Sequence, residues 1–339
     1  MIDPLLSELL VAPSPPGNEQ PTREILVREL GRYGELVETR WSGFYMALEG
    51  NKDDGSRPKV VLTAHMDAPG FIVRSIRDDG RLDLIHLGGI NPRVASPRSI
   101  VLRAGKKRFD GVITVNDPGA GRNADYTGFF GFKDRKQAES RGVKIGDPVA
   151  WHDPPVELEN GYVATTHADN RLGCWLLCHL AEALSSSKRK RTVDLYFAAT
   201  GCEEIGGRGA RIMGQMIEPD LALCFDATYE LGEVKMGAGP CVTISDASVI
   251  LPVGVRDRLS KRAKKKKIPL QYEVYNYSGT DASGFREVGS GCLTICPLVP
   301  SLNNHTPREI FKLSDLEATA ALALEIVADT PALLAAVNA

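Results

Sequence analysis

The chain lacks the sequence features that direct a protein into a membrane or onto a nucleic acid. No apolar run reaches about 18 residues, the length that a helix needs to cross a bilayer. The opening residues carry neither the basic nor the apolar region of a secretory signal. The formal net charge of -2 predicts no general attraction to nucleic acid or to anionic lipid. We therefore expect a cytoplasmic protein with no membrane or nucleic-acid partner.

The chain also lacks cysteine pairs with the spacing of metal ligands. Its 7 cysteines, an odd number, are scattered through apolar segments between Cys174 and Cys296. Such cysteines usually pack as small hydrophobic side chains in a reducing compartment. Cys202 precedes Glu203 and could modulate chemistry there, but a thiol nucleophile would also need a histidine-based constellation. Neither a disulfide framework nor a thiolate-bound structural zinc is expected.

Two basic runs, residues 188–191 and 261–267, would favour a nucleic-acid partner if taken alone. Basic segments of that kind normally carry interleaved aromatic residues or belong to a basic domain, and neither condition holds here. A solvated helix face or loop is the better interpretation of both runs.

The 339 residues, 43% of them hydrophobic, can bury a large core and can form two domains. Residues 70–161 consist of short strand-like runs separated by turn signals such as Asp79-Gly80 and Asn160-Gly161. This pattern of short strands and turns predicts a small, β-barrel-like all-β domain inserted into an α/β catalytic domain. The catalytic domain would combine residues 1–69 with residues 162–339.

Helical spacing marks both ends of the chain. Leucines and isoleucines before residue 31 predict two amphipathic helices, separated by the proline-rich break at residues 13–17. The leucine- and alanine-rich residues 313–335 predict one long packing helix.

Histidine and acidic residues follow several strand-like runs. The apolar residues 59–64 are typical of a buried parallel strand, and residues 193–199 and 221–225 are similar. In open α/β sheets, ligands gather beyond the carboxyl ends of such strands. The candidate side chains that follow these runs are His65, Asp67, Glu203, Glu204 and Asp226. Two further candidates, Asp169 and His305, lie elsewhere in the chain.

This set of donors predicts a metal site. Alone, a His-x-Asp or a Glu-Glu pair usually has a structural or surface explanation, but their position after predicted strands favours a site here. Imidazole with carboxylate suits zinc, cobalt or manganese. The donors are too many for one open ion, whereas two ions ~3.5–4 Å apart can share a bridging carboxylate. Asp67 would orient His65, and one further carboxylate would remain free to act as a base.

In order and spacing these residues resemble the tetrahedral (deblocking or glutamyl-type) aminopeptidases, dinuclear metallopeptidases of the zinc exopeptidase clan. The resemblance covers nearly the whole chain. The matching stretches are His65-Met66-Asp67, Asp169-Asn170-Arg171, Glu203-Glu204-Ile205-Gly206, Asp226-Ala227-Thr228, Gly279-Thr280-Asp281-Ala282, and His305-Thr306-Pro307 with Glu309.

The resemblance implies an α/β fold in which helices flank a mixed sheet. It implies a cytosolic enzyme that removes N-terminal residues from peptides by means of a metal-activated water. Glu203 corresponds to the general base and Asp67 to the carboxylate behind His65, although the sequence itself does not say which of the two adjacent glutamates is the base. The implied ligands of two divalent ions (zinc, cobalt or manganese) are His65 and Asp226 for one ion, Glu204 and His305 for the other, and Asp169 as the bridge.

Two further expectations follow from the resemblance. The substrates would be peptides with a free N-terminus, and the inserted domain would build a homo-oligomer, a dodecamer assembled from dimers. A related two-metal amidohydrolase on the same scaffold, such as a deacylase or dipeptidase, is the alternative function. The stretch Gly279-Thr280-Asp281-Ala282 and the β insertion favour the aminopeptidases. His167 departs from the family pattern, which has a small residue two positions before the bridging aspartate.

Overall fold

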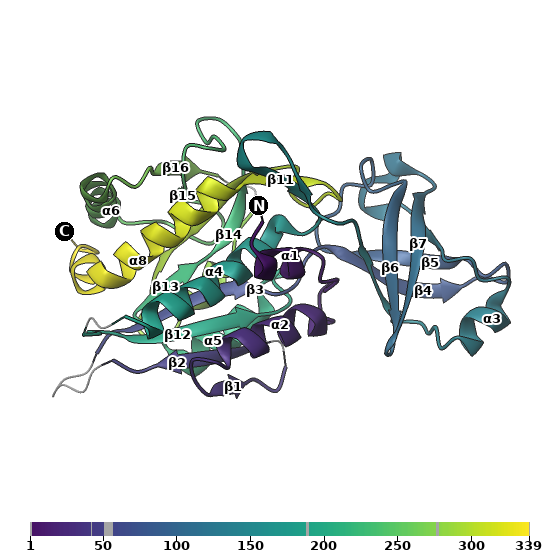
Figure 1. Cartoon of the computed structure of the whole chain (residues 1–339), viewed down its shortest axis with the longest axis horizontal. Helices are drawn as coiled ribbons and strands as arrows, with labels where there is room; N and C mark the ends of the chain where they lie inside the picture. The colour runs from purple at the N-terminus through teal and green to yellow at the C-terminus, as the bar shows by residue number, and fades with distance from the viewer. Residues whose placement is uncertain (1, 42, 51–56, 188–189, 276–277, 339) are drawn as a thin grey trace.

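The computed structural model describes residues 2–41, 43–50, 57–187, 190–275 and 278–338. Figure 1 shows an α/β part, in which helices flank the sheets, and a β-barrel that projects to one side. The predicted fold class, α/β with a mixed sheet and an inserted all-β part, is confirmed.

A six-stranded sheet forms the centre of the α/β part. Four neighbouring strands, from β12 to β17, are parallel to one another, and β2 on their other side pairs antiparallel with both β12 and the edge strand β1. The parallel strands are almost wholly buried because helices cover both faces, which explains their continuous apolar sequences. In order across the sheet the strands are β1 (Leu36–Glu38), β2 (Gly43–Leu48), β12 (Asp194–Thr200), β3 (Lys59–His65), β13 (Leu221–Cys224) and β17 (Leu293–Ile295).

The alternation of side chains along β3 divides the core into two layers. Val60 and Leu62 belong to the cluster formed with α1, α2, α4 and α8, whereas Val61 belongs to the cluster formed with α5 and α7. The helices of the two layers are α1 (Pro4–Leu10), α2 (Gln20–Leu30), α4 (Ala168–Ser185) and α8 (Leu313–Ala335) on one side, and α5 (Arg208–Ile217) and α7 (Ala282–Phe285) on the other.

A second sheet of seven strands lies beside the first; α8 packs on this sheet, and α6 (Val253–Lys266) packs on α8. Six of its strands follow one another in a single order, the main path, and strand β14 pairs with β18 outside that order. The strands of the path are β10 (Val156–Glu157), β11 (Tyr162–Thr165), β19 (Glu309–Lys312), β18 (Pro297–Leu302), β15 (Cys241–Ser245) and β16 (Gln271–Val274), with β14 at Asp226–Tyr229. A short 3-10 turn, Glu159–Gly161, joins β10 to β11.

Helix α8 is long and apolar enough, by length and composition, to cross a membrane. Half of its most apolar window, 50%, is nevertheless buried inside the protein. Its buried residues, among them Leu322 and Ile326, join the main core cluster. The apolar character of α8 is therefore accounted for by its packing on β18, α4 and α6.

The projecting part is a closed six-stranded barrel with a core of its own. Phe71 and Trp151 pack edge to face inside it, with ring centroids 5.5 Å apart. The barrel ends at Trp151, so the predicted insertion of residues 70–161 also contains β10, which pairs in the second sheet. The strands in order around the barrel are β4 (Gly70–Ile76), β5 (Leu82–Leu87), β8 (Tyr126–Phe129), β7 (Lys107–Val115), β6 (Arg98–Ala104) and β9 (Pro148–Trp151), joined by the turns Pro118–Asn123 and α3 (Arg135–Ser140).

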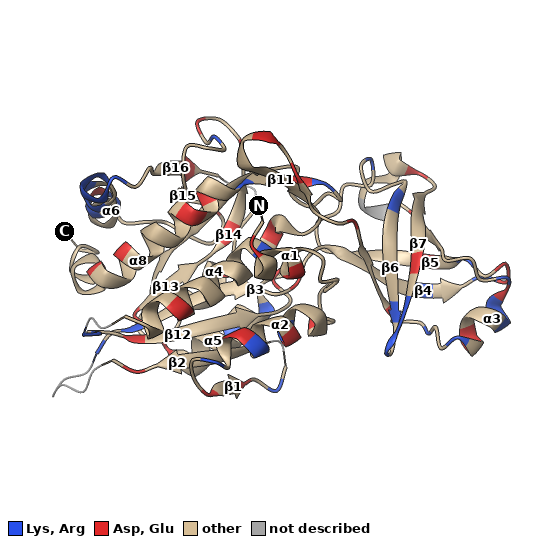
Figure 2. Cartoon of the chain, in the orientation of Figure 1, with Lys and Arg blue, Asp and Glu red and all other residues tan. Residues whose placement is uncertain are grey.

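The basic run at residues 261–267 lies on α6, where Figure 2 shows a concentration of Lys and Arg. Arg262 and Lys266 form ion pairs with Glu325 on α8. The run is therefore a solvated helix face that is partly neutralised by acids on its neighbour. Residues 188 and 189 of the other basic run lie outside the described residues.

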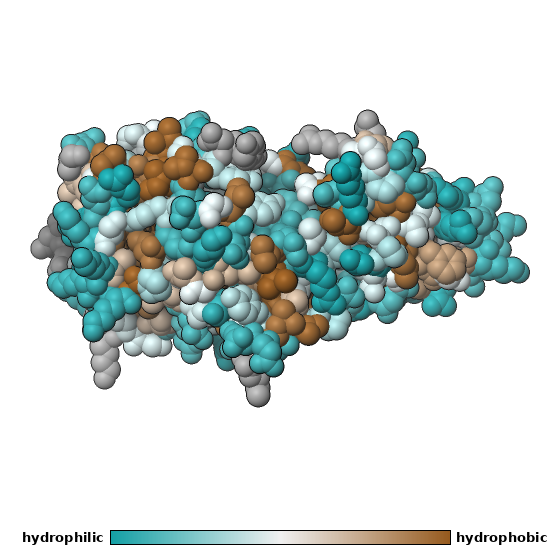
Figure 3. All heavy atoms as spheres, turned by 90° about the horizontal axis from the view of Figure 1, so that it is seen from above, coloured by the Kyte–Doolittle hydropathy of each residue, from teal (hydrophilic) through white to brown (hydrophobic). Residues whose placement is uncertain are grey.

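All 7 cysteines are buried and lie outside any disulfide, as expected from their apolar surroundings. On the face shown in Figure 3, hydrophobic side chains form separate patches among hydrophilic ones, over both the α/β part and the barrel.

Candidate metal centre

The predicted site residues come together where the parallel strands of the central sheet end. His65 is the last residue of β3, and Glu203 and Glu204 follow the end of β12. Asp226 is the first residue of β14, and a single residue separates it from the end of β13. The other two predicted ligands come from outside the central sheet, Asp169 from the first turn of α4 and His305 from the connection between β18 and β19.

Two groups of possible ligand atoms share the Asp169 carboxylate. In each group the atoms lie within 4.8 Å of one another. Asp169 Oδ1 is 3.3 Å from His65 Nε2, and Asp169 Oδ2 is 3.3 Å from His305 Nε2. One carboxylate thus lies between two imidazoles, an arrangement suited to a bridging ligand. The groups are His65, Asp169 and Asp226, and Asp169, Glu204 and His305.

The two imidazoles present the same ring nitrogen to the site. His65 Nδ1 is 3.1 Å from the Asp67 backbone carbonyl, and His305 Nδ1 is 3.0 Å from the Gly89 carbonyl. A carbonyl accepts a hydrogen bond, so in the neutral rings these contacts assign the proton to Nδ1 and leave Nε2 as the donor to a metal. Gly89 belongs to the inserted segment, so the barrel side of the molecule helps to orient His305.

The carboxylate oxygens at the centre are deficient in hydrogen bonds. Asp169 Oδ1 and Glu204 Oε1 are buried, and neither has a hydrogen-bond partner in the described part of the chain. A buried ionised oxygen without a partner is costly unless a cation neutralises it. The donor set and these oxygens therefore fit divalent ions.

Burial and the closely spaced charges at the centre change the pKa values of its ionisable groups. Burial, with a contribution from the nearby Asp169 carboxylate, raises the pKa of Glu204 to about 8 and that of Asp226 to about 7. Burial opposes protonation of His65, but Asp226, Asp169 and Asp67 outweigh it and hold the pKa of this imidazole well above its ordinary value. Without metal, the cluster would retain protons in place of the missing positive charge.

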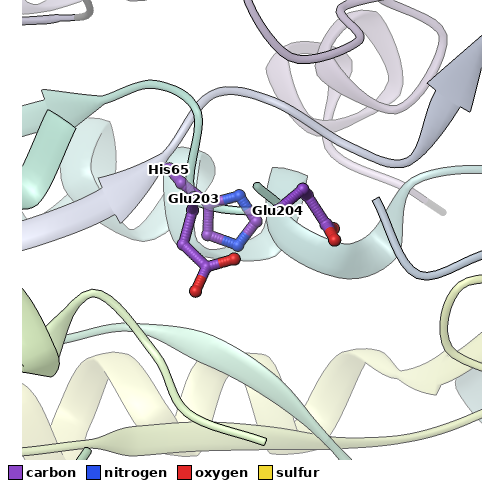
Figure 4. A group of neighbouring side chains, drawn as sticks. All are labelled: His65, Glu203 and Glu204. Carbon is purple, nitrogen blue, oxygen red and sulfur yellow. The ribbon is translucent and has the colours of Figure 1, made fainter. Parts of the chain in front are cut away.

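Glu203 lies apart from the bridging aspartate. It joins His65 and Glu204 in a third group of nearby donors, and in the view of Figure 4 its carboxylate lies below the His65 ring whereas that of Glu204 lies to the right of the ring. Burial holds the pKa of Glu203 well above its ordinary range, and Asp226 and Glu204 add to this. A carboxylate with a raised pKa at the edge of such a centre suits proton transfer.

Asp67 contacts the site in a way that the sequence did not indicate. Its carboxylate is 3.6 Å from His65 Nδ1, farther than the Asp67 backbone carbonyl. Instead, Oδ1 accepts the backbone N–H of Glu203 at 3.0 Å and Oδ2 accepts that of Glu204 at 3.1 Å. Asp67 therefore fixes the main chain of both glutamates in addition to lying behind His65.

A cavity of about 380 Å³ opens beside these residues. Beyond the metal ligands, its wall includes Tyr229, Tyr275, Glu273 and Gly279. A volume of this size can hold a side chain and the adjoining peptide bond of a substrate.

His167 and Cys202 are both buried, and both take left-handed backbone conformations, with φ of 67° and 58°. His167 Nε2 lies 3.1 Å from the Trp151 carbonyl at the end of the barrel. Burial, with a contribution from Arg171, lowers the pKa of His167 to about 3, so the ring is neutral and donates this hydrogen bond. His167 is thus a buried contact to the barrel and belongs to none of the three donor groups found among the described residues.

Two residues of the stretches that match the family, Arg171 and Glu309, were assigned no function in the sequence analysis. Arg171 is fully buried beside Asp169, and Glu309 accepts two backbone hydrogen bonds from metal-ligand residues. A charged residue directly before the apolar stripe of α4 was a signal for Arg171. No local pattern marked the role of Glu309.

Comparison with known proteins gives one consistent result. Residues 45–322 match the sequence profile described as M42 glutamyl aminopeptidase. A lysyl aminopeptidase from Pyrococcus furiosus is 29% identical over 287 residues, which cover 79% of this chain and 81% of that protein.

Solved structures agree with this match. The aminopeptidase APDkam598 from the archaeon Desulfurococcus kamchatkensis superposes with a TM-score of 0.89 at 26% identity, covering 99% of this chain and 97% of the other. The TET1 peptidase of Pyrococcus horikoshii, described as able to assemble into a tetrahedron or a large octahedral shell, has a TM-score of 0.83 at 26% identity, covering 95% and 98%.

Proposed function

The chain belongs to the M42 glutamyl aminopeptidase family and is a metal-dependent aminopeptidase, and we propose that it acts through two divalent ions held by five clustered side chains. The observation that carries the proposal is the Asp169 carboxylate, which lies 3.3 Å from Nε2 of both His65 and His305. The full ligand set consists of His65, Asp169, Glu204, Asp226 and His305.

The ions would be zinc, cobalt or manganese, because the donors are imidazole and carboxylate and no cysteine belongs to the donor groups of the described residues. When bound, such ions supply Lewis acidity toward the scissile carbonyl and lower the pKa of water. The free α-amino group of the substrate can pair with an ion or with a carboxylate of the cavity wall.

Glu203 is the proposed general base. Its carboxylate takes a proton from the attacking water and returns that proton to the leaving amine. The assignment is supported by the donor groups of the described residues: Glu203 is in neither of the two groups that share Asp169, whereas Glu204 is in one of them. Asp67 holds the backbone of both glutamates, so the base and the ligand keep fixed positions relative to each other.

We further propose that the protein is a closed homo-oligomer, a dodecamer built from dimers through the barrel, in the cytoplasm. The relative from Pyrococcus horikoshii assembles into shells. Large apolar side chains are exposed on the barrel, including Phe129 at 54% and Val112 at 44%. A face of this kind favours burial against another subunit. The buried cysteines, none of which forms a disulfide, fit a reducing compartment.

A substrate panel tests the proposed function. Metal-free protein is reloaded with zinc, cobalt or manganese and assayed on aminoacyl chromogenic substrates and on their N-blocked counterparts. The aminopeptidase proposal expects cleavage of substrates with a free amino group and loss of cleavage on chelation. Release of the blocking acyl group from the N-blocked substrates, without release of the chromophore from either kind of substrate, would instead indicate a deacylase on the same scaffold.

A further inference from the structure

We propose that Glu309 is a positioning residue that fixes the main chain of two metal ligands, Asp169 and His305. This inference rests on the proposed metal centre. Glu309 begins β19 and is 2% exposed. Its Oε2 accepts the backbone N–H of Asp169 at 3.0 Å, and its Oε1 accepts the backbone N–H of His305 at 2.8 Å. Glu309 is in none of the donor groups of the described residues, so it acts through the ligands.

Both ligands need such a restraint because neither has its backbone fixed by a strand. His305 has φ of 62°, in the left-handed region, which costs a residue other than glycine on the order of 1–3 kcal/mol and persists only when the surroundings hold it. Asp169 lies two residues after His167, whose φ is 67°. One carboxylate with two acceptor oxygens fixes both segments to β19 and to each other, although they are far apart in the sequence.

Asp67 does the same for the other side of the centre. Its two oxygens accept the N–H groups of Glu203 and Glu204, next to Cys202 with its left-handed backbone. Glu309 and Asp67 together therefore hold the main chain of every member of one ligand group, Asp169, Glu204 and His305.

The other ligand group depends less on this device. His65 ends β3 and Asp226 begins β14, so strand pairing fixes the backbone of both. Of that group, Glu309 holds Asp169 alone. Loss of Glu309 should therefore weaken mainly the ion that Glu204 and His305 hold, and to a smaller degree the ion that His65 and Asp226 hold.

The variant Glu309→Gln tests this at the level of single atoms. A glutamine side chain has one acceptor oxygen and one NH₂ group, so it can accept one of the two backbone N–H groups and must face the other with a donor. Metal affinities of the metal-free protein for Zn²⁺ and Co²⁺ are measured by calorimetry, and the visible spectrum of bound Co²⁺ reports the ligand geometry.

Asp315→Asn is the matched control. Asp315 is 1% exposed and its carboxylate also accepts two backbone N–H groups, from Gly237 at 2.6 Å and Gly239 at 2.9 Å. It does not line the cavity beside the metal ligands. The control therefore removes the same kind of buried contact away from the centre.

The wild type is expected to bind two ions. In Glu309→Gln at least one dissociation constant should rise roughly 10–100-fold, with an altered Co²⁺ spectrum. The control Asp315→Asn should keep the wild-type constants. Unchanged constants in Glu309→Gln, or an equal loss in Asp315→Asn, would overturn the inference while leaving the metal centre in place. Absence of metal from the wild type would refute the proposed function itself. If Glu309→Gln does not fold, Glu309→Asp decides by the same titration, because its shorter side chain should also raise a dissociation constant.

Discussion

Asp67 Oδ1 accepts the backbone N–H of Glu203 at 3.0 Å, so the carboxylate behind the proposed metal ligand His65 also fixes the proposed base on a neighbouring strand end. Asp67 follows β3 and Glu203 follows β12, which are adjacent parallel strands. The catalytic geometry is therefore built by a contact between two strand ends, and substitutions at the two adjacent glutamates can be separated by what each glutamate does.

Glu203→Gln should keep both metal ions and lose turnover by ~10²–10⁴-fold, because glutamine preserves the size of the side chain but cannot accept a proton. Glu204→Gln should reduce metal binding first, because Glu204 belongs to a ligand group. Co²⁺ titration with parallel rates on a peptide with a free N-terminus distinguishes the two effects. Interchanged phenotypes, or a wild-type kcat in Glu203→Gln, would show that base and ligand have been assigned the wrong way round.

The metal-free protein should lose stability as the pH rises toward about 8. Burial raises the pKa of Asp226 to about 7 and that of Glu204 to about 8, so these carboxyl groups hold protons in the folded state that the unfolded state has released. The raised pKa of His65 acts in the same direction. A folded state that binds more protons is destabilised by rising pH. The lowered pKa of Asp169 acts oppositely, but only in strong acid.

Denaturant unfolding of the metal-free and metal-loaded protein across this pH range measures the effect. Bound ions displace the protons, so metal affinity should increase with pH and the loaded protein should show a flatter stability profile. A metal-free protein that becomes more stable between about pH 6 and 8 would contradict the pKa directions on which this expectation is based.

Arg171→Met should destabilise the fold by roughly 3–5 kcal/mol, because it removes a buried charge that pairs with backbone carbonyls. Its Nη1 donates to Met66 O at 2.7 Å and Asp67 O at 3.2 Å, and its Nη2 donates to Ala12 O at 3.1 Å. These carbonyls would be left buried without a donor. Urea unfolding measures the loss, with Arg256→Met as the control because the exposed Arg256 bonds its neighbour Asp257. Equal stabilities of the two variants would show that the buried contacts contribute little.

The purified protein should have a mass several times that of the 36.8 kDa chain. Replacement of the exposed Phe129 and Val112 by serine should reduce that mass while leaving the barrel folded, since both side chains point to solvent. Light scattering measures the mass and circular dichroism checks the fold. A monomer at all concentrations and metal contents would contradict assembly, and an unchanged oligomer in the double variant would place the interface elsewhere.

The sequence predicted those parts of the protein that depend on local patterns. The apolar run before His65 identified β3, and similar runs identified β12 and β13, because strands covered on both faces are apolar throughout. The residue types after these runs predicted a metal centre of imidazole and carboxylate. Helical spacing predicted α8 with the bounds that the structure shows.

Tertiary structure decided how the donors are held. Asp67 and Glu203 are 136 residues apart in the chain, and Asp169 and Glu309 are 140 apart. Whether a carboxylate binds metal, accepts backbone N–H groups or carries a proton depends on which groups the fold brings within hydrogen-bond distance. The same residue type therefore serves as proposed metal ligand at Glu204, as proposed base at Glu203 and as proposed backbone restraint at Glu309, and no local sequence pattern separates these roles.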